Sequence, residues 1–321
     1  MKITKLSNNL SPIHQGVFFG IDTENDSPEN IAVEVVNSTT GEVVATQQIR
    51  GVTTAKINIA PYLAHAIKQR PTTQSHTSIA DAPTATYHIR IGEVESESVT
   101  VSVNSCALTP NTIITTMPSK RRMAYGESDE VLLYCPAESL ISAHLTSDKS
   151  EEISVEGVTN SGIATLSIST EDFGATTRKL SVELLCNGVL FGRLDYTIAP
   201  TTPQATRLVW TSELGSIERY TFPITRKSNL TISKRLVRTE DELQTIRSIT
   251  RKIDTLASRY EPRATIEALV QAASAIKVWA EDEYGLHEVE VCNSSIEYNL
   301  FNEPDILILE VCKEQKEVVV W

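Results

Sequence analysis

Histidine, cysteine and carboxylate side chains supply most metal ligands in proteins, and their spacing in this chain does not build a metal site. The six histidines occur singly, with no cysteine, second histidine or suitable carboxylate at helical or strand-neighbour spacing. The cysteines show no Cys-x-x-Cys spacing, which excludes a locally built zinc knuckle or dithiol redox motif. They are Cys106, Cys135, Cys186, Cys292 and Cys312. We therefore expect no metal ion, no cofactor and, because five is an odd number, at least one unpaired thiol.

The sequence patterns of common enzyme active sites are also absent. The chain contains no GxSxG, HExxH, GxxxxGK[ST] or GxGxxG motif and no EF-hand loop. One acidic run, Glu281, Asp282 and Glu283, could hold a cation, but calcium loops use carboxylates that other residues separate. Consecutive carboxylates before Tyr284 and Gly285 are more typical of the solvated turn of a β-hairpin. The sequence thus predicts no catalytic residue and a protein that is not an enzyme.

Charge is distributed unevenly along the chain. Lysine and arginine number 29 against 41 aspartates and glutamates, and the net charge of -12 argues against a protein that binds polyanions with its whole surface. Residues 217–263 nevertheless hold eleven basic and six acidic residues, so the remainder carries -17. Two interpretations of this basic segment are open. It is a solvated face, or it is a basic face that meets an acidic face of another copy. No nucleic acid is expected, because interleaved aromatic residues are lacking.

The first third of the chain alternates apolar and polar residues, as half-buried strands do. The sequence Asn-Ser-Thr-Thr-Gly at 37–41 predicts a hairpin turn. A short helix is expected over residues 61–69 and a mobile loop over residues 70–83. The expected strands cover residues 31–35, 43–45, 56–59, 87–91 and 99–103. We predict an immunoglobulin-like β-sandwich for residues 1–104.

A second β-sandwich with its linker is predicted for residues 105–203. Asn187 and Gly188 form a strong two-residue turn signal between two of its strands. The closing sequence Ala-Pro-Thr-Thr-Pro at 199–203 favours an extended linker. The expected strands cover residues 131–134, 152–158, 163–168, 179–185 and 190–198.

The last third, residues 204–321, is predicted to be an α+β assembly domain. Thr239 and Glu242 form a capping box, and apolar residues at helical spacing continue from it to Pro262, so a helix is expected over residues 239–260. On that helix a candidate assembly face would lie outside the apolar stripe. It consists of Arg247, Arg251, Lys252 and Arg259. A second helix is expected over residues 266–273, and strands over 207–210, 217–222, 230–237, 276–280, 289–292, 306–311 and 318–321.

One segment carries a resemblance. Residues 207–222 read RLVWTSELGSIERYTF. Trp210, Gly215, Tyr220 and Phe222 match a pattern that resembles tail structural proteins of phages and prophages of Bacteroides-like bacteria. Ser212 stands where an Asn is more usual, and Glu218 stands where an Asp is expected. The four matching residues would act by packing, with the aromatic rings in the core of a hairpin and the glycine in its turn.

The resemblance implies a non-enzymatic structural protein, a phage tail or baseplate virion component that acts through protein–protein assembly. Its partners would be other copies of itself or neighbouring tail proteins. Residues 1–13 lack the apolar run of a signal peptide, and no stretch is long enough to span a membrane, so we expect synthesis in the cytoplasm followed by incorporation into a virion. The alternative is a cell-surface adhesin or carbohydrate-binding β-sandwich protein, with a glycan as ligand.

Overall fold

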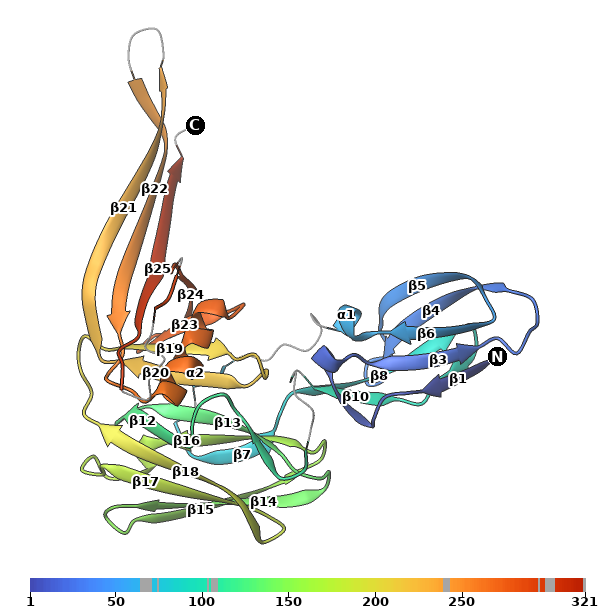
Figure 1. Ribbon diagram of the computed structural model, residues 1–321, viewed down its shortest axis with the longest axis horizontal. Coiled ribbons are helices and arrows are strands. Elements are labelled where there is room, and N and C mark those ends of the chain that lie inside the picture. Colours follow the sequence, from blue (N-terminus) through green and yellow to red (C-terminus); the bar gives the residue numbers. More distant parts are fainter. Residues whose placement is uncertain are drawn as a thin grey trace.

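The computed structural model (Figure 1) describes residues 1–63, 71–73, 75–102, 104, 109–238, 243–293, 295–297 and 304–319. Strands hold 60% of the residues and helices 7%, which confirms the prediction of a mainly β protein. The strands of this part form five sheets. One pair of sheets is N-terminal, a second pair lies in the middle, and a seven-stranded C-terminal sheet extends upward from the middle pair in Figure 1.

The N-terminal part is a mostly antiparallel β-sandwich of immunoglobulin-like kind. Inward residues of both its sheets, such as Phe19, Val33 and Ile89, share one core with Leu63 of the short helix α1 (Ala60–Leu63). The expected hairpin turn at 37–41 is confirmed between β4 and β5. The first sheet contains β1 (Lys2–Lys5), β3 (Phe18–Asp22) and β6 (Thr54–Asn58); the second contains, in order, β2 (Leu10–Pro12), β10 (Val99–Ser102), β8 (Thr84–Ile91), β4 (Glu29–Asn37) and β5 (Val43–Val52), with β9 (Val94–Glu95) beside β8. The continuation of the expected helix through residues 64–69 lies outside the described residues.

The middle part is a second sandwich, built from a four-stranded and a five-stranded sheet. Its core contains Leu133, Ile141, Leu166 and Val182, which come from strands of both sheets. The turn at residues 187–188 is confirmed, since both residues have positive φ angles (49° and 77°). The sheets contain, in order, β11 (Thr112–Ile114), β13 (Ser128–Tyr134), β16 (Ile163–Ser169) and β7 (Ser78–Asp81), and β12 (Lys120–Ala124), β18 (Val189–Ala199), β17 (Lys179–Cys186), β14 (Ser139–Ser147) and β15 (Glu152–Thr159).

Strand β7 corrects the prediction of a mobile loop over residues 70–83. It pairs antiparallel with β16, so a segment from within residues 1–104 completes a sheet of the second sandwich. Its flanks are anchored by hydrogen bonds: the Thr77 amide donates to Asp172 Oδ2 at 2.6 Å, and the Asn160 amide donates to Asp81 Oδ1 at 3.0 Å. The polar composition of this segment predicted a loop. The sequence did not predict the strand, because the residues that hold it in place lie about 80 to 95 positions away.

The C-terminal part is a single seven-stranded sheet with one helix against it. Helix α2 (Arg263–Ser274) confirms the expected helix at 266–273, and its Ile266 and Leu269 pack with Leu208, Trp210 and Phe222 of the sheet. The strand order is β20 (Ile217–Phe222), β19 (Thr206–Thr211), β23 (Val278–Asp282), β24 (Gly285–Val291), β25 (Ile308–Val319), β22 (Leu243–Ala257) and β21 (Ile224–Arg238). The two closing strands expected at 306–311 and 318–321 are one strand, β25, which ends at Val319 in the described part.

The helix expected over residues 239–260 is wrong. Residues 239–242, which include the capping box, lie outside the described residues, and the following residues form strand β22. This strand pairs antiparallel with β21 on one side and with β25 on the other, along most of its length. It is rich in threonine and isoleucine, whose branched side chains favour strands over helices. Pairing on both sides therefore outweighs the helical spacing of its apolar residues.

The contact between β7 and β15 makes a testable prediction about packing. A Cβ atom on Gly157 of β15 would lie 2.8 Å from Ile79 Cγ2 and 3.3 Å from the Ile79 carbonyl oxygen. Gly157→Ala should therefore lower the free energy of unfolding by about 1 to 3 kcal/mol, measured by urea denaturation. Gly20→Ala, where the nearest side-chain atom would be 3.5 Å away, is the matched control and should change it by less than about 1 kcal/mol. Equal effects of the two variants would contradict this packing of β7.

Candidate functional site

Three buried arginines lie where the second sandwich meets the C-terminal sheet. Arg121 belongs to β12, Arg207 to β19 and Arg219 to β20, and their side chains are 3%, 6% and 0% exposed. Alternate residues of a strand point to opposite faces. Arg207 and Arg219 thus lie on one face of the β19–β20 hairpin, while Trp210 and Tyr220 lie on the other, in the core beneath α2. We call these arginines and their carboxylate partners the ion network.

Arg207 joins the two parts of the chain through several hydrogen bonds. Its Nη1 donates to Glu127 Oε2 at 2.6 Å, and its Nε donates to Glu281 Oε2 at 2.9 Å. Nη2 donates to the carbonyl oxygen of Ser128, at the start of β13. Because Glu127 and Ser128 belong to the second sandwich and Glu281 to β23, one guanidinium holds three segments together.

Arg219 makes a second connection to β13. Its Nη2 donates to Glu130 Oε2 at 3.0 Å and to the Thr72 carbonyl oxygen at 2.6 Å, while Nη1 donates to Ser128 Oγ at 3.3 Å. The Thr72 hydroxyl donates in turn to Glu130. The segment before β7 is thereby tied to the same contact.

Arg121 and Glu218 form the third part of the network. Arg121 Nη1 donates to Asp129 Oδ2 at 2.8 Å and lies 4.0 Å from Glu218 Oε2. The Glu218 carboxylate accepts hydrogen bonds from the Ser216 hydroxyl at 2.6 Å and from the Thr115 hydroxyl at 2.8 Å. Glu218, which lies within the segment that carries the resemblance, is therefore hydrogen-bonded to the loop between β11 and β12.

Burial raises the pKa of both Glu218 and Glu130, although nearby arginines act in the opposite direction. Carboxylates with a raised pKa often act as general acids, which makes these two the strongest catalytic candidates in the described part. Their side chains are 1% and 7% exposed, and protein donors occupy their oxygens, so a substrate cannot reach them. The arrangement joins segments of the chain and offers no reacting group.

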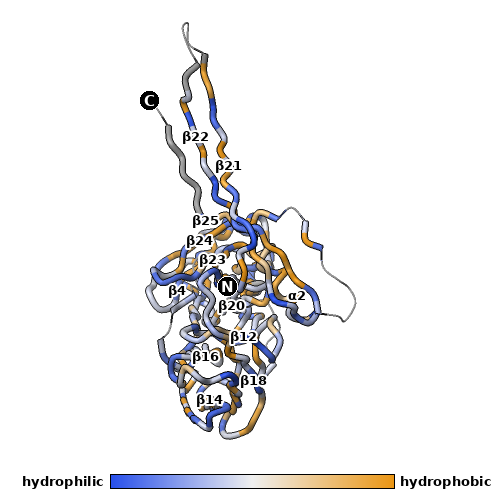
Figure 2. Tube along the Cα trace, turned by 90° about the vertical axis from the view of Figure 1, so that its left-hand side faces the viewer, coloured by the Kyte–Doolittle hydropathy of each residue, from blue (hydrophilic) through white to orange (hydrophobic). Residues whose placement is uncertain are grey.

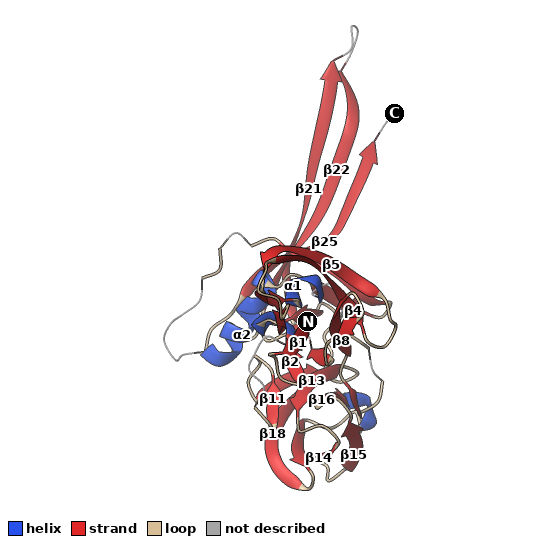
Figure 3. Cartoon of the chain, turned by 90° about the vertical axis from the view of Figure 1, so that its right-hand side faces the viewer, coloured by secondary structure: helices blue, strands red, loops and turns tan. Residues whose placement is uncertain are grey.

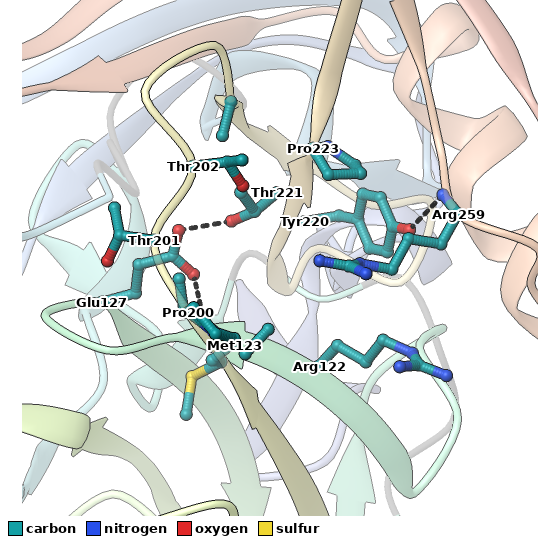
Figure 4. A pocket seen from close by; sticks show the side chains of 13 residues that line it. Arg122, Met123, Glu127, Pro200, Thr201, Thr202, Tyr220, Thr221, Pro223 and Arg259 are labelled. Atoms are coloured by element: carbon teal, nitrogen blue, oxygen red, sulfur yellow. Dashed lines mark hydrogen bonds between the residues drawn. The ribbon is translucent and has the colours of Figure 1, made fainter. Parts of the chain in front are cut away.

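A small pocket lies beside the ion network (Figure 4). Arg122, Glu127, Tyr220, Thr221 and Arg259 are among the residues that line it, and its interior space is about 30 Å³. The Arg259 amide donates to the Tyr220 hydroxyl at 3.2 Å, and the Thr221 hydroxyl donates to Glu127 Oε1 at 2.6 Å. A space of this size holds about one water molecule. The pocket is too small for an organic substrate.

The structure brings together the four residues of the resembling motif. Trp210, Tyr220 and Phe222 are at most 3% exposed, and the last two rings pack edge to face with centroids 5.0 Å apart. Gly215 has a φ angle of 82°, in the left-handed region that glycine adopts without strain, in the turn between β19 and β20. Glu218, which departs from the motif, is the member that contacts the ion network.

The candidate assembly face does not form as expected, because its residues lie on a strand. Arg247 and Arg251 share one face of β22, Lys252 lies on the other, and Arg259 follows the strand at the edge of the pocket. The four residues would share one side only on a helix, in which positions four apart are neighbours. Arg247, Arg251, Lys252 and Arg259 therefore do not form one face.

An exposed arm takes the place of the expected helix. The distal parts of β21, β22 and β25 extend away from the body as three long strands (Figure 1), and the view from the side shows the same projection (Figure 3). Leu256 and Leu309 anchor its base in the core, whereas Leu230, Ile232 and Leu236 of β21 are 62%, 55% and 54% exposed. Hydrophobic and hydrophilic segments both occur along β21 and β22 (Figure 2).

A buried carboxylate fixes the base of the arm. Asp254 of β22 accepts a hydrogen bond from the Ser228 hydroxyl of β21 at 2.5 Å. It also forms an ion pair with Lys313 of β25 at 3.2 Å. Burial acts to raise the pKa of Asp254, but these partners lower it below its usual range. The three strands of the arm are thus joined by side chains where they leave the body.

No metal site or membrane helix is found in the described part of the chain. It contains no cluster of three or more His, Cys, Asp or Glu side chains suited to a metal ion. None of its helices is long and apolar enough to cross a membrane. Cys135, Cys186, Cys292 and Cys312 are free thiols here, and burial raises the pKa of Cys135 to about 12. Cys106 lies outside the described residues.

Comparisons with known proteins identify no family. No family model matches the sequence, and no curated protein matches it. Among solved structures, the chicken interferon gamma receptor alpha chain is 11% identical, with 57% of this chain and 90% of the receptor chain covered and a TM-score of 0.18. A Salmonella alpha-2-macroglobulin is 10% identical over 99% of this chain and 21% of its own, with a TM-score of 0.22. A tetra-tandem repeat of a large adhesion protein is 8% identical over 98% and 89%, also with a TM-score of 0.22. Such low scores carry no argument about function.

Sequence reasoning did not find the ion network. A signal was present, because Asp129 and Glu130 open an otherwise apolar strand and Glu127 directly precedes it. Arg207 and Arg219 lie within two other strands. Charged residues are rarely fully buried unless they are paired. What the sequence does not contain is the pairing between segments that lie about 80 to 90 positions apart.

Removing one partner of the ion network tests its role. Arg219→Met leaves Glu130 buried without its cation, so we expect the free energy of unfolding to fall by about 3 to 5 kcal/mol in urea denaturation. The double variant Arg219→Met/Glu130→Gln should recover part of that loss, because no unpaired charge remains. As a control, Arg193→Ala breaks an exposed pair with Asp195 and should cost about 1 kcal/mol or less. A loss of similar size for Arg219→Met and Arg193→Ala would contradict the network.

Proposed function

We propose that the chain is a non-enzymatic structural protein, a tail or baseplate component of a phage-like particle that acts through protein–protein assembly. The observation that carries the proposal is the arm. Its distal strands carry exposed apolar side chains, and β21, the last strand of the sheet, has a backbone edge that pairs with no other described strand. Exposed apolar residues and open strand edges are typical of surfaces that bind another chain.

The resemblance in residues 207–222 supports the particle as the setting of this assembly. The proposed partners are other copies of the chain or neighbouring tail proteins, and no role is proposed for a cofactor, a nucleic acid or a membrane. Synthesis in the cytoplasm would precede incorporation into the virion. The ion network would hold the arm in a fixed direction relative to the second sandwich, as a structural component requires.

Incorporation into particles tests the proposal. Particles released by the source cells should contain the chain in many copies at a fixed ratio to other particle proteins, measured by quantitative mass spectrometry. Leu230→Asn/Ile232→Asn should lower incorporation at least about tenfold, because these substitutions remove apolar surface from the arm. Val189→Asn/Leu190→Asn, on a similarly exposed hairpin, is the matched control and should leave incorporation unchanged. Particles without the chain, together with glycan binding by the free protein, would contradict the proposal and favour an adhesin.

A further inference from the structure

Strand β21 is a long basic strand at the edge of the C-terminal sheet. Its fifteen residues include five lysines and arginines and no acidic residue. Two exposed basic pairs, Arg226 with Lys227 and Lys234 with Arg235, form no ion pair within the described residues. Leu230 and Ile232 lie between the two pairs. The strand therefore presents positive charge, apolar surface and positive charge in that order.

The charge of β21 disfavours pairing with the same strand of another copy. An antiparallel pair centred on Thr231 would place Lys227 of each strand opposite Arg235 of the other. Like charges directly opposite each other destabilise a strand pair. The charges of the arm therefore favour an acidic partner.

The β23–β24 hairpin at the other side of the arm has the opposite composition. Residues 278–291 include five acidic residues and no lysine or arginine. Glu281 is held by Arg207, but Asp282, Glu283, Glu288 and Glu290 are exposed. Tyr284, in the hairpin turn next to Asp282 and Glu283, is 82% exposed, although tyrosine usually buries its ring. The hairpin thus presents an exposed aromatic ring at its turn and negative charge along β24.

The spacing of the two surfaces also corresponds. The basic pairs of β21 lie eight residues apart, which is about 26 Å along an extended strand. Asp282 pairs with Gly285, so Glu290 lies five residues farther along β24, about 17 Å from the hairpin turn. This length matches the five residues from Leu230 to Arg235, so the hairpin can reach one basic pair together with the apolar residues beside it. Leu230 and Ile232 would then face Tyr284, while Lys234 and Arg235 meet Glu288 and Glu290.

These surfaces cannot meet within one chain. The sheet order places β25 and β22 between β24 and β21, so the acidic hairpin and the basic edge lie on different sides of the arm. β24 pairs with β25 only at Glu290 and Val291, and the rest of the hairpin diverges from the arm. The basic edge of one copy can, however, reach the acidic hairpin of the next.

We infer that the chain assembles head to tail, with strand β21 of one copy docked on the β23–β24 hairpin of a second copy. This inference rests on the proposed function and names the partner of the arm. A contact between two different surfaces of identical chains closes into a ring or continues as a filament, depending on the rotation between neighbours. Complementary charge would set the register, and the apolar residues between the charges would contribute affinity.

Charge exchange between two variants of the full chain provides the test, measured by sedimentation velocity at increasing protein concentration in about 0.1 M salt. Lys234→Glu/Arg235→Glu makes the strand acidic, and Glu288→Lys/Glu290→Lys makes the hairpin basic. Each variant alone should self-associate at least about tenfold more weakly than the natural chain. A mixture of the two should regain association, because each altered surface now meets an opposite charge on the other variant. Association of the natural chain should weaken in about 1 M salt, where the screening length falls to about 3 Å.

A matched control separates local from general charge effects. Glu152→Lys/Glu156→Lys reverses two exposed charges on β15, the edge strand of a different sheet, and should leave association unchanged. Thermal unfolding of all variants checks that each remains folded. A natural chain that stays monomeric at all concentrations overturns the inference. So does association that the hairpin variant does not weaken, that the mixture does not regain, or that requires added nucleic acid.

The outcome also separates this inference from the proposed function. If the chain is found in particles but does not self-associate, the inference fails and the arm binds a different particle protein. If the charge exchange succeeds but no particle contains the chain, head-to-tail assembly stands and the proposed setting fails.

Discussion

Burial of three arginine side chains is the interaction on which the C-terminal half of the molecule depends. Transfer of a charge from water into protein costs several kcal/mol unless a partner of good geometry compensates for it. Arg207 and Arg219 pair with Glu127 and Glu130 only when the second sandwich lies against the β19–β20 hairpin. Arg121 pairs with Asp129 of its own sandwich and reaches the hairpin through Glu218. The alternative, an arginine buried alone, is strongly unfavourable. The network therefore selects one relative placement of the second sandwich and the C-terminal sheet.

That placement continues directly into the arm. β20, which carries Arg219, is followed by the buried Pro223 and then by β21, so the edge strand begins five residues after Arg219. Near the start of β21, Asp254 of β22 contacts Ser228 of β21 and Lys313 of β25. Isolated ribbons of two strands are marginally stable in water. A third strand and this fixed base give the arm the support from which its exposed distal part can contact another chain.

The sequence predicted those parts of the fold that local patterns determine. Alternation identified most strands of both sandwiches, and Asn187 with Gly188 identified a turn that requires two positive φ angles. It failed where distant segments decide the structure. β7 is a strand because β16 offers it a partner, and β22 is a strand because β21 and β25 pair with it on both sides. The ion network was missed for the same reason. The arm was missed because the helical spacing of the apolar residues in β22 predicted a helix there.

Residue-resolved hydrogen exchange under native conditions tests most directly whether the ion network joins the second sandwich and the C-terminal sheet into one cooperative unit. The amides of β13 and β20 lie on opposite sides of the network. If the network unites them, both sets should exchange with the same free energy of opening, equal to that of global unfolding, and both should weaken together as urea is added. Exchange of the β20 amides at a clearly lower free energy than the β13 amides would show that the C-terminal sheet opens by itself, and would contradict the account.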